Sequence, residues 1–324
     1  MNSNFKKFLN KIKSWHLILL FFLINIIFLE NFPFVHSDEA WLSGLSRQIM
    51  QTGNLSITES FFDLLPRHPH AVKIFFHFLQ ILFIKILDYN IFTFRLISLL
   101  SSSLAAFFFY KTTLLISKSK KLSLAALLVL IVDIHFIYSS HFARQEAVLL
   151  FIFLAALYYF LKYNTGKNSE KKGSFLKTNN SSRKQKNNST NNPEDDFILA
   201  LILGTAIGFH PNAFIIALPF ILSYSYRLLI KKISIKNYLI FGISLSLIAG
   251  LFIYFSFKLD PNFISNYSSY GKQLGVLDSF AVKFENLKNF YLKLYYRVSG
   301  TYYIPPINFQ LIFFSFTALI SFFK

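Results

Sequence analysis

The sequence predicts an all-α, polytopic integral membrane protein, with about eight transmembrane helices and further juxtamembrane helices in the interface. Hydrophobic residues make up 54% of the 324 residues and charged residues only 15%, whereas an ordinary soluble domain has about 25% charged residues. Apolar runs recur along the chain, and many approach the ~20 residues that a helix needs to cross a bilayer. No separate soluble domain is visible, so residues 1–324 are expected to form a single membrane domain.

The apolar runs give the expected spans in order. The first run follows a basic N-terminus, but its apolar core is long and no small-residue cleavage site follows it. This pattern indicates an uncleaved first span rather than a signal peptide. The expected spans are residues 15–30, 92–116, 122–138, 146–162, 197–209, 213–230, 237–257 and 308–323.

Two further apolar segments are expected to lie along the membrane surface. Residues 71–87 place Lys73, His77 and Gln80 on one helical face, with Phe and Ile around the rest. Residues 280–298 alternate aromatic and basic residues between faces. Such amphipathic patterns are typical of interfacial helices.

The distribution of positive charge predicts the orientation of the spans. With the N-terminus in the cytoplasm, the inner segments are 1–14, 117–121, 163–196 and 231–236, and all are rich in Lys or Arg, as the positive-inside rule requires. Much of the net charge of +18 is then explained without a nucleic-acid partner. Cysteine is absent, which excludes disulfides, thiolate catalysis and cysteine-ligated metals.

The long inner segment 164–196 differs in composition from its surroundings. It is rich in Asn, Ser and Lys and has almost no large apolar residues, so it cannot bury enough surface to fold. We expect a disordered cytoplasmic loop that could touch anionic lipid head groups. It separates the first four spans (1–163, with outer loop 31–91) from the later spans (197–324, with outer loop 258–306).

Polar residues that are unusual in such a chain collect on the outer side of this topology. They occur in four segments, "HSDEAW" after the first span, "RHPH" in the same outer loop, "HFARQEA" between spans three and four, and "GFHPNAF" between spans five and six. The residues brought to this common level are Asp38, Glu39, Arg67, His68, His70, Arg144, Glu146 and His210.

Each segment also has a purely structural interpretation. Asp38 and Glu39 could form the first turn of a helix with Ser37 as its N-cap, because carboxylates there favour the helix dipole. The "RHPH" cations could lie near lipid phosphates, and "HFARQEA" could be a solvated turn in which Arg144 pairs with Glu146. The His-Pro-Asn run could simply break a helix.

Asp133 and His135 fall toward the outer end of the third span. Ionisable residues at such a depth normally face a bundle interior or a wet cavity. They could support the outer site, or they could pair with each other.

In this order and on this side, the four segments resemble the GT-C fold glycosyltransferases that use polyprenyl-phosphate-linked sugars. This group contains the protein O-mannosyltransferases and the lipid A aminoarabinose transferases. "SDEAWLSGLSRQIMQTGN" is similar to the first outer loop of the family, and "SSHFARQEAVLLFIFLAALYYFLKY" to its Ala-Arg-Pro segment. The resemblance covers roughly residues 10 to 230.

The sequence departs from the family pattern at several positions. His70 stands where a second Pro is common, Gln145 where Pro or an apolar residue is usual, and His68 and His210 where the aminoarabinose transferases use Lys. Family members also typically carry several more spans. We therefore expect either a short member or a C-terminally truncated product, and a truncated product could be inactive.

The resemblance implies that a sugar passes from a polyprenyl-phosphate donor to an acceptor hydroxyl at the outer face, with inversion. Asp38 would be the general base, and Glu39, grouped with it as a catalytic residue, would orient the phosphate-binding cations or the acceptor. The other implied roles are donor phosphate binding by Arg67, His68, His210 and Arg144, and support from Glu146, His70, Asp133 and His135.

The implied partners are the lipid-linked donor, a lipid, glycan or protein acceptor, and membrane lipids, but no nucleic acid. No cofactor is expected, although a carboxylate-bound divalent metal stays an alternative. The expected location is the plasma (inner) membrane, with several passes and an extracytoplasmic active site. Competing hypotheses are a lipid-linked sugar transporter or flippase, an oligosaccharyltransferase-like or polymer ligase enzyme, and an inactive fragment of a larger GT-C enzyme.

Overall fold

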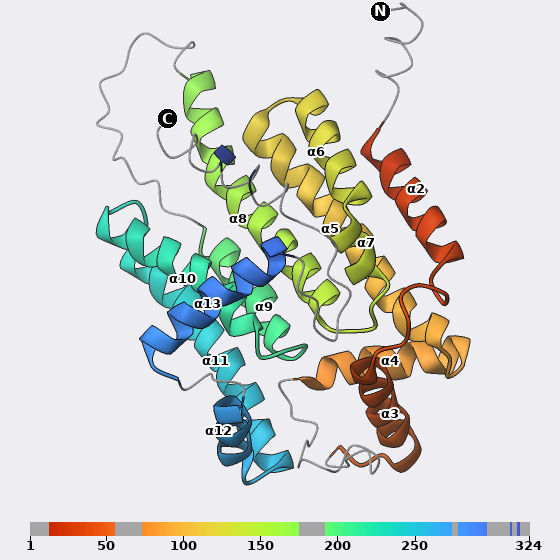
Figure 1. Cartoon of the computed structure of the whole chain (residues 1–324). Helices are drawn as coiled ribbons and strands as arrows, with labels where there is room; N and C mark the ends of the chain where they lie inside the picture. Colours follow the sequence, from red (N-terminus) through yellow and green to blue (C-terminus); the bar gives the residue numbers. More distant parts are fainter. Residues whose placement is uncertain are drawn as a thin grey trace, which may run out of the picture. The chain divides into compact units, whose positions relative to one another are not determined.

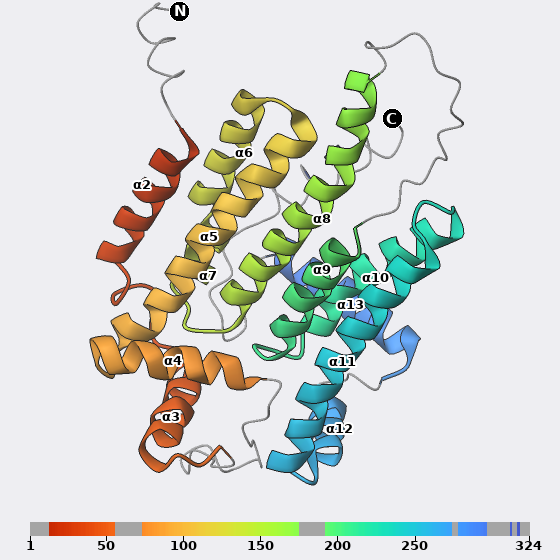
Figure 2. The same ribbon diagram turned by 180° about the vertical axis from the view of Figure 1, so that it is seen from behind.

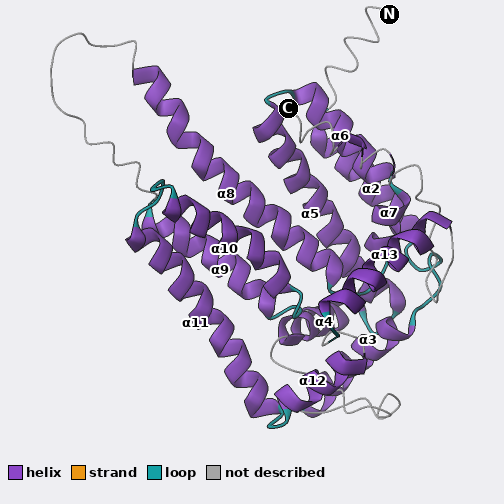
Figure 3. Ribbon diagram, turned by 60° about the vertical axis from the view of Figure 1, so that its left-hand side comes forward, coloured by secondary structure: helices purple, strands orange, loops and turns teal. Residues whose placement is uncertain are grey.

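The computed structural model describes residues 13–55, 73–174, 192–273 and 278–296, together with positions 312 and 316–317. Within these residues every regular element is a helix and there is no strand (Figure 3). The predicted all-α class is therefore confirmed. The chain divides into two compact units, residues 1–261 and 262–324.

The first unit contains ten of the labelled helices (Figure 1). They are α2 (Ser14–Ile27), α3 (Ser37–Thr52), α4 (Ile74–Leu87), α5 (Ile91–Ser117), α6 (Lys120–Val132), α7 (Ile134–Ser140), α8 (Glu146–Ser174), α9 (Pro193–Ile207), α10 (Ala213–Leu229) and α11 (Ile235–Leu259). Two groups form within it: α5 packs against α8, α6 and α2, whereas α9 packs against α11, α8 and α10.

The second unit contains α12 (Phe263–Gln273) and α13 (Phe280–Tyr296). The helix expected over residues 280–298 is thus present as α13. On it, Lys288 and Glu285 form an exposed ion pair, with Nζ 3.5 Å from Oε1. The position of α13 at a membrane surface stays a prediction.

Each expected span from 15–30 to 237–257 coincides with a helix or a pair of helices, and 308–323 falls almost wholly outside the described residues. By length and composition, α5, residues 146–163 of α8, and α11 are able to cross a membrane. A fourth is added if α6 and α7 are taken as one bent span. These apolar helices are those of a membrane protein. The count of eight spans stays a prediction.

The expected helix over 122–138 is broken. The axes of α6 and α7 differ by 64°, and Asp133 stands between them. Its Oδ1 accepts the backbone N–H groups of His135 (3.0 Å) and Phe136 (2.9 Å), which makes it the N-cap of α7. An aspartate that satisfies these free N–H groups favours the start of a new helix over continuation of the old one.

The boundaries of the expected disordered loop 164–196 were wrong at both ends. Helix α8 continues to Ser174, and α9 begins at Pro193, while residues 175–191 lie outside the described residues. At the start of α9, Pro193 occupies a first-turn position where its missing N–H costs nothing. Three acidic residues of the same turn complement the helix dipole, so a polar run that we assigned to the loop is a helix start.

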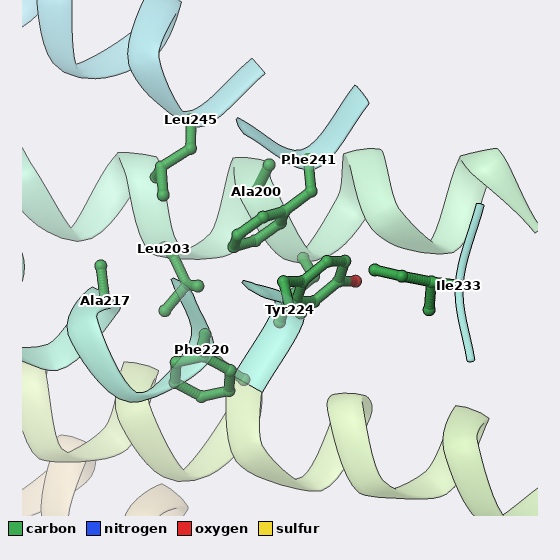
Figure 4. Packing of buried hydrophobic residues seen from close by; sticks show 10 residues of the cluster. Ala200, Leu203, Ala217, Phe220, Tyr224, Ile233, Phe241 and Leu245 are labelled. Atoms are coloured by element: carbon green, nitrogen blue, oxygen red, sulfur yellow. The ribbon is translucent and has the colours of Figure 1, made fainter. Parts of the chain in front are cut away.

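Helices α8 to α11 surround a shared core (Figure 4). Its buried residues are Ala156, Leu199, Ala200, Leu203, Ala217, Phe220, Tyr224, Ile233, Phe241 and Leu245. The ring of Tyr224 stacks on Phe241, with centroids 4.0 Å apart and planes 13° from parallel. The alanines let neighbouring helices approach closely, as small residues do between membrane helices.

A buried carboxylate ties the same four helices together at one end. Asp196, in the first turn of α9, is fully buried and accepts hydrogen bonds from the Tyr224 hydroxyl (2.6 Å), the Tyr163 hydroxyl and the Asn237 side-chain amide. Its donors belong to α8, α10 and α11. We call this group of four side chains the Asp196 clasp.

Figure 2 shows α4 lying across the end of α5 that is nearer to α3. The polar face of α4 is not turned to water as expected, since His77 and Gln80 are buried. The hydroxyl of Ser46 on α3 lies 2.9 Å from His77 Nδ1 and 2.5 Å from Gln80 Oε1. The face that we read as interfacial therefore packs on α3, because buried polar groups need hydrogen-bond partners.

Candidate active site

The first turn of α3 holds both carboxylates of "HSDEAW". The helix begins at Ser37 with His36, not Ser37, as its N-cap. Nδ1 of His36 accepts the N–H of Asp38 (3.1 Å), and the carboxylate of Glu39 accepts the N–H of His36 (2.9 Å). This reciprocal arrangement is a capping box with Glu39 at its third position. The structural interpretation is thus correct for Glu39, with the cap one residue earlier than predicted.

Asp38 meets the turn between α7 and α8. Nη1 of Arg144 lies 3.4 Å from Oδ2 of Asp38, and Nη2 lies 2.8 Å from Oε1 of Glu146. The predicted pairing of Arg144 with Glu146 is confirmed. The exposed fractions of the side chains are 30% for Asp38, 26% for Arg144 and 45% for Glu146, so all three can reach a ligand.

Glu39 follows Asp38 in the sequence, but its side chain is fully buried. Its Oε1 and Oε2 each accept a hydrogen bond from Arg95, at 3.0 Å from Nε and 3.0 Å from Nη2. Oε1 also accepts the N–H of Ala143 at 2.8 Å. Adjacent helical residues point to different faces, and here one faces outward and the other inward. We therefore correct the expectation that Glu39 is a catalytic residue, because it has no access to a substrate.

His210 stands in the turn between α9 and α10. The turn is tied to the start of α4, because the Phe75 N–H donates to the Gly208 carbonyl at 2.9 Å. Within the turn, the N–H of Asn212 donates to His210 Nδ1 at 3.0 Å. This bond fixes the neutral imidazole with its proton on Nε2.

The surroundings of His210 keep it uncharged. Burial lowers its pKa to about 4, with smaller contributions from the positive charges of Lys73 and Arg144. The phosphate-binding role expected of His210 stays a prediction, and the lowered pKa favours the neutral imidazole as the form that would act there. Because the charges of Lys73 and Arg144 both lower this pKa, the start of α4 and the turn before α8 lie within electrostatic range of His210.

The segments that the sequence grouped together are thus largely brought together. Asp38, Arg144 and Glu146 are in direct contact, and His210 lies near Arg144. The other two predicted phosphate-binding residues, Arg67 and His68, and the predicted supporting residue His70 lie outside the described residues. The segment that carries them leads into Lys73, whose ammonium lies 5.5 Å from the ring centroid of Trp41.

Asp133 and His135 form a local pair, with Nδ1 of the imidazole 3.7 Å from Oδ1 of the carboxylate. This was the second of the two alternatives. Both stand at the start of α7, whereas Arg144 follows its end. Seven helical residues, about 10 Å of helix, separate these positions.

Sequence reasoning assigned no role in the site to Lys73, Arg95 or His36. Arg95 gave a usable signal, because a charged residue within an apolar helix almost always pairs with another group. Lys73 was noticed only as part of an interfacial face. Within the part of the chain that the structure describes, no group of three or more His, Asp or Glu side chains is arranged to hold a metal ion.

Comparison with known proteins adds one observation. Residues 71–180 match the family model of dolichyl-phosphate-mannose-protein mannosyltransferase. The match runs from the start of α4 through α8 and includes Lys73, Arg95, Arg144 and Glu146, but neither Asp38 nor His210. No curated protein and no solved structure matches the chain.

The matched family and the apolar helices together fit a membrane glycosyltransferase of the GT-C type. They also support, in general terms, a sugar donor linked to a polyprenyl phosphate. At this level the match supports the expected class of enzyme, a glycosyltransferase.

Proposed function

We propose that the protein transfers a hexose, mannose in line with the matched family, from a polyprenyl-phosphate donor to a hydroxyl of an acceptor molecule. The observation that carries the proposal is the contact between Asp38 and Arg144. It puts a partly exposed carboxylate beside a guanidinium that suits a phosphate. A protein hydroxyl is the acceptor that the family favours, and a lipid or glycan hydroxyl has the same reacting group.

In this proposal Asp38 is the general base. Its carboxylate takes the proton of the acceptor hydroxyl while the acceptor oxygen attacks the anomeric carbon. The bond from that carbon to the phosphate oxygen breaks, and the lipid phosphate leaves with the electron pair. Attack and departure on opposite faces invert the anomeric configuration. Positioned proton abstraction typically contributes about 10²–10⁴-fold to the rate.

The cations beside Asp38 would stabilise the leaving phosphate. Arg144 presents a planar guanidinium that suits phosphate oxygens, and Lys73 adds a second charge close by. His210 contributes a neutral Nε2–H donor, because Nδ1 is occupied by the Asn212 N–H. Groups that are already aimed at the developing charge lower the barrier without reorganisation. The proposed chemistry needs no metal ion.

The location follows from the orientation of the spans. We propose that the N-terminus is cytoplasmic and that the site faces the extracytoplasmic side of the plasma membrane. Reporter fusions after residues 60 and 180 test this orientation. A cytoplasmic signal at residue 60 would contradict it.

The function is tested with the purified protein in liposomes that contain polyprenyl-phosphate-mannose labelled in the sugar. A serine- and threonine-containing peptide is supplied on the outer side, and labelled peptide is separated from lipid. The expected product is a glycosylated peptide with inverted anomeric configuration. Movement of donor between leaflets without product would instead support a flippase. Neither product nor movement with a range of hydroxyl acceptors would contradict both.

A further inference from the structure

The inner side of the candidate site is built on a buried ion pair that the proposed chemistry does not use. Arg95 and Glu39 both have fully buried side chains. Arg95 donates to both carboxylate oxygens of Glu39 and, through Nη1, to the carbonyl of Leu29 at 3.0 Å. We call this pair and its backbone partners the Glu39–Arg95 strut.

The strut reaches the backbone on both sides of the site. Glu39 accepts the N–H of His36, two residues before Asp38, and the N–H of Ala143, the residue directly before Arg144. One carboxylate thereby links the two chain segments whose side chains meet as the Asp38 and Arg144 pair.

Helix α5, which carries Arg95, also holds the segment around Arg144 at a second point. Ser98, one turn after Arg95 on α5, donates through Oγ to the Phe142 carbonyl at 2.7 Å and lies 3.4 Å from the Arg144 carbonyl. Residues three apart share a helical face, so α5 presents one polar face to this turn. The turn between α7 and α8 is therefore fixed from α5 both directly and through Glu39.

We propose that Arg95 is a positioning residue for the proposed transfer, acting through Glu39 to fix the base Asp38 at its distance from Arg144. This inference rests on the proposed function for its chemistry, but its geometric part is independent of it. A buried ion pair is weak support for stability, because well-packed apolar side chains often serve as well. The five hydrogen bonds of the Glu39–Arg95 strut instead specify where the backbone before Asp38 and the backbone before Arg144 lie.

Arginine is required by this geometry. Its rigid fork supplies two parallel donors to one carboxylate and a third to Leu29, whereas the single ammonium of lysine acts as a point charge. Arg95→Lys keeps the charge and loses the fork. It therefore separates positioning from charge neutralisation.

The geometric test uses the absence of cysteine from the chain. Cysteines are introduced at Ser37 and Leu150, both exposed and outside the proposed machinery, and are spin-labelled in the protein in nanodiscs. Pulsed electron–electron double resonance then gives the distribution of distances between the label at the start of α3 and the label near the start of α8. Arg95→Lys and Glu39→Gln are expected to broaden or shift this distribution.

The matched control is Asp196→Asn. Asp196 is also a fully buried carboxylate with several donors, but it lies at the other end of α9 from His210. It is expected to lower thermal stability and leave the label distances unchanged. An unchanged distribution in Arg95→Lys and Glu39→Gln would overturn the proposal.

The kinetic test measures kcat and KM for the donor in Arg95→Lys, scaled to the folded fraction. A misplacement of about 1 Å can cost about 10²-fold, so kcat is expected to fall by about that factor while Asp196→Asn keeps its kcat. A loss in proportion to the folded fraction in both variants would mean a merely structural role and would overturn the proposal. If the wild type transfers nothing but the distances broaden in the strut variants, the proposed function fails and the positioning stands.

Discussion

The guanidinium of Arg144 contacts the carboxylate of Asp38, with Nη1 3.4 Å from Oδ2, while its other nitrogen Nη2 holds Glu146 at 2.8 Å. The three side chains come from the start of α3, the turn before α8 and the first residue of α8. Because Arg144 is shared between two carboxylates, a phosphate can replace one partner while the other still orients the guanidinium. The pair is thus suited to a ligand that arrives and leaves.

Replacement of Arg144 by Gln is expected to lower kcat/KM for the lipid donor by about 10²–10³-fold, because one preorganised donor to developing charge is removed. Arg144→Lys should recover only part of this, since an ammonium cannot make the bidentate contact. The measurement is donor-dependent transfer in liposomes. Lys85→Gln, an exposed cation of α4, is the control and should stay near the wild-type value. Equal losses in both variants would contradict a specific role of Arg144.

His210 should make the protein less stable as the pH falls. Its folded-state pKa of about 4 lies below the ordinary value of 6.5, so between these two values the unfolded chain binds more protons than the folded one. Stability from this residue is complete above pH 6.5 and is lost as the pH falls toward 4. The midpoint of thermal unfolding is measured in micelles at pH 7.5 and 4.5, for the wild type and His210→Gln.

The drop between the two pH values should be smaller in His210→Gln. His77, whose pKa burial lowers to about 3, contributes to both proteins and cancels in the comparison. The same drop in both proteins would show that His210 is not held neutral by its surroundings.

The Asp196 clasp should contribute to stability without affecting transfer. Asp196→Ala removes the buried acceptor of the Tyr224 hydroxyl and of the Asn237 amide, and the loss of such a buried hydrogen-bond partner costs about 1–3 kcal/mol. Thermal unfolding in micelles measures the loss. Glu194→Gln, exposed in the same helical turn, should change the midpoint far less. Comparable shifts in both variants would argue against the clasp.

Gly208 is expected to tolerate no side chain. A Cβ there would lie 2.5 Å from Cδ2 of Phe75 and 2.8 Å from ring atoms of Phe252, so Gly208→Ala must push the start of α4 away from the turn. Lys73 would then move away from His210, and both stability and donor affinity should fall. Gly242→Ala, where nothing lies within 4 Å, should be neutral or slightly stabilising in its helix. Thermal midpoints and donor KM of the two variants are compared, and a neutral Gly208→Ala would contradict the close approach.

The helices could be predicted because a membrane helix has a local sequence signal, a long apolar run. Their interruptions could not be placed in the same way. Asp133 sits inside such a run and breaks it, since its carboxylate caps a new helix. The first turn of α9 is acidic, which is a signal for the start of a helix. Because this turn ends the polar run 164–196, the overall composition of that run conceals the signal.

The candidate site was predictable in part for a related reason. Topology alone placed Asp38, Arg144 and His210 on one side, and the structure brings them near one another. The direction of each side chain was not predictable, because it depends on partners distant in the sequence. Glu39 faces inward because Arg95, 56 residues away, lies there.

The most direct test of the account is the single-turnover rate of Asp38→Asn with saturating polyprenyl-phosphate-mannose and peptide. Asp88→Asn, an exposed aspartate after α4, is the matched control. The account predicts a rate lower by about 10²–10⁴-fold for Asp38→Asn, with donor binding retained, and an unchanged rate for Asp88→Asn. Wild-type rates in both variants would show that Asp38 is not the base.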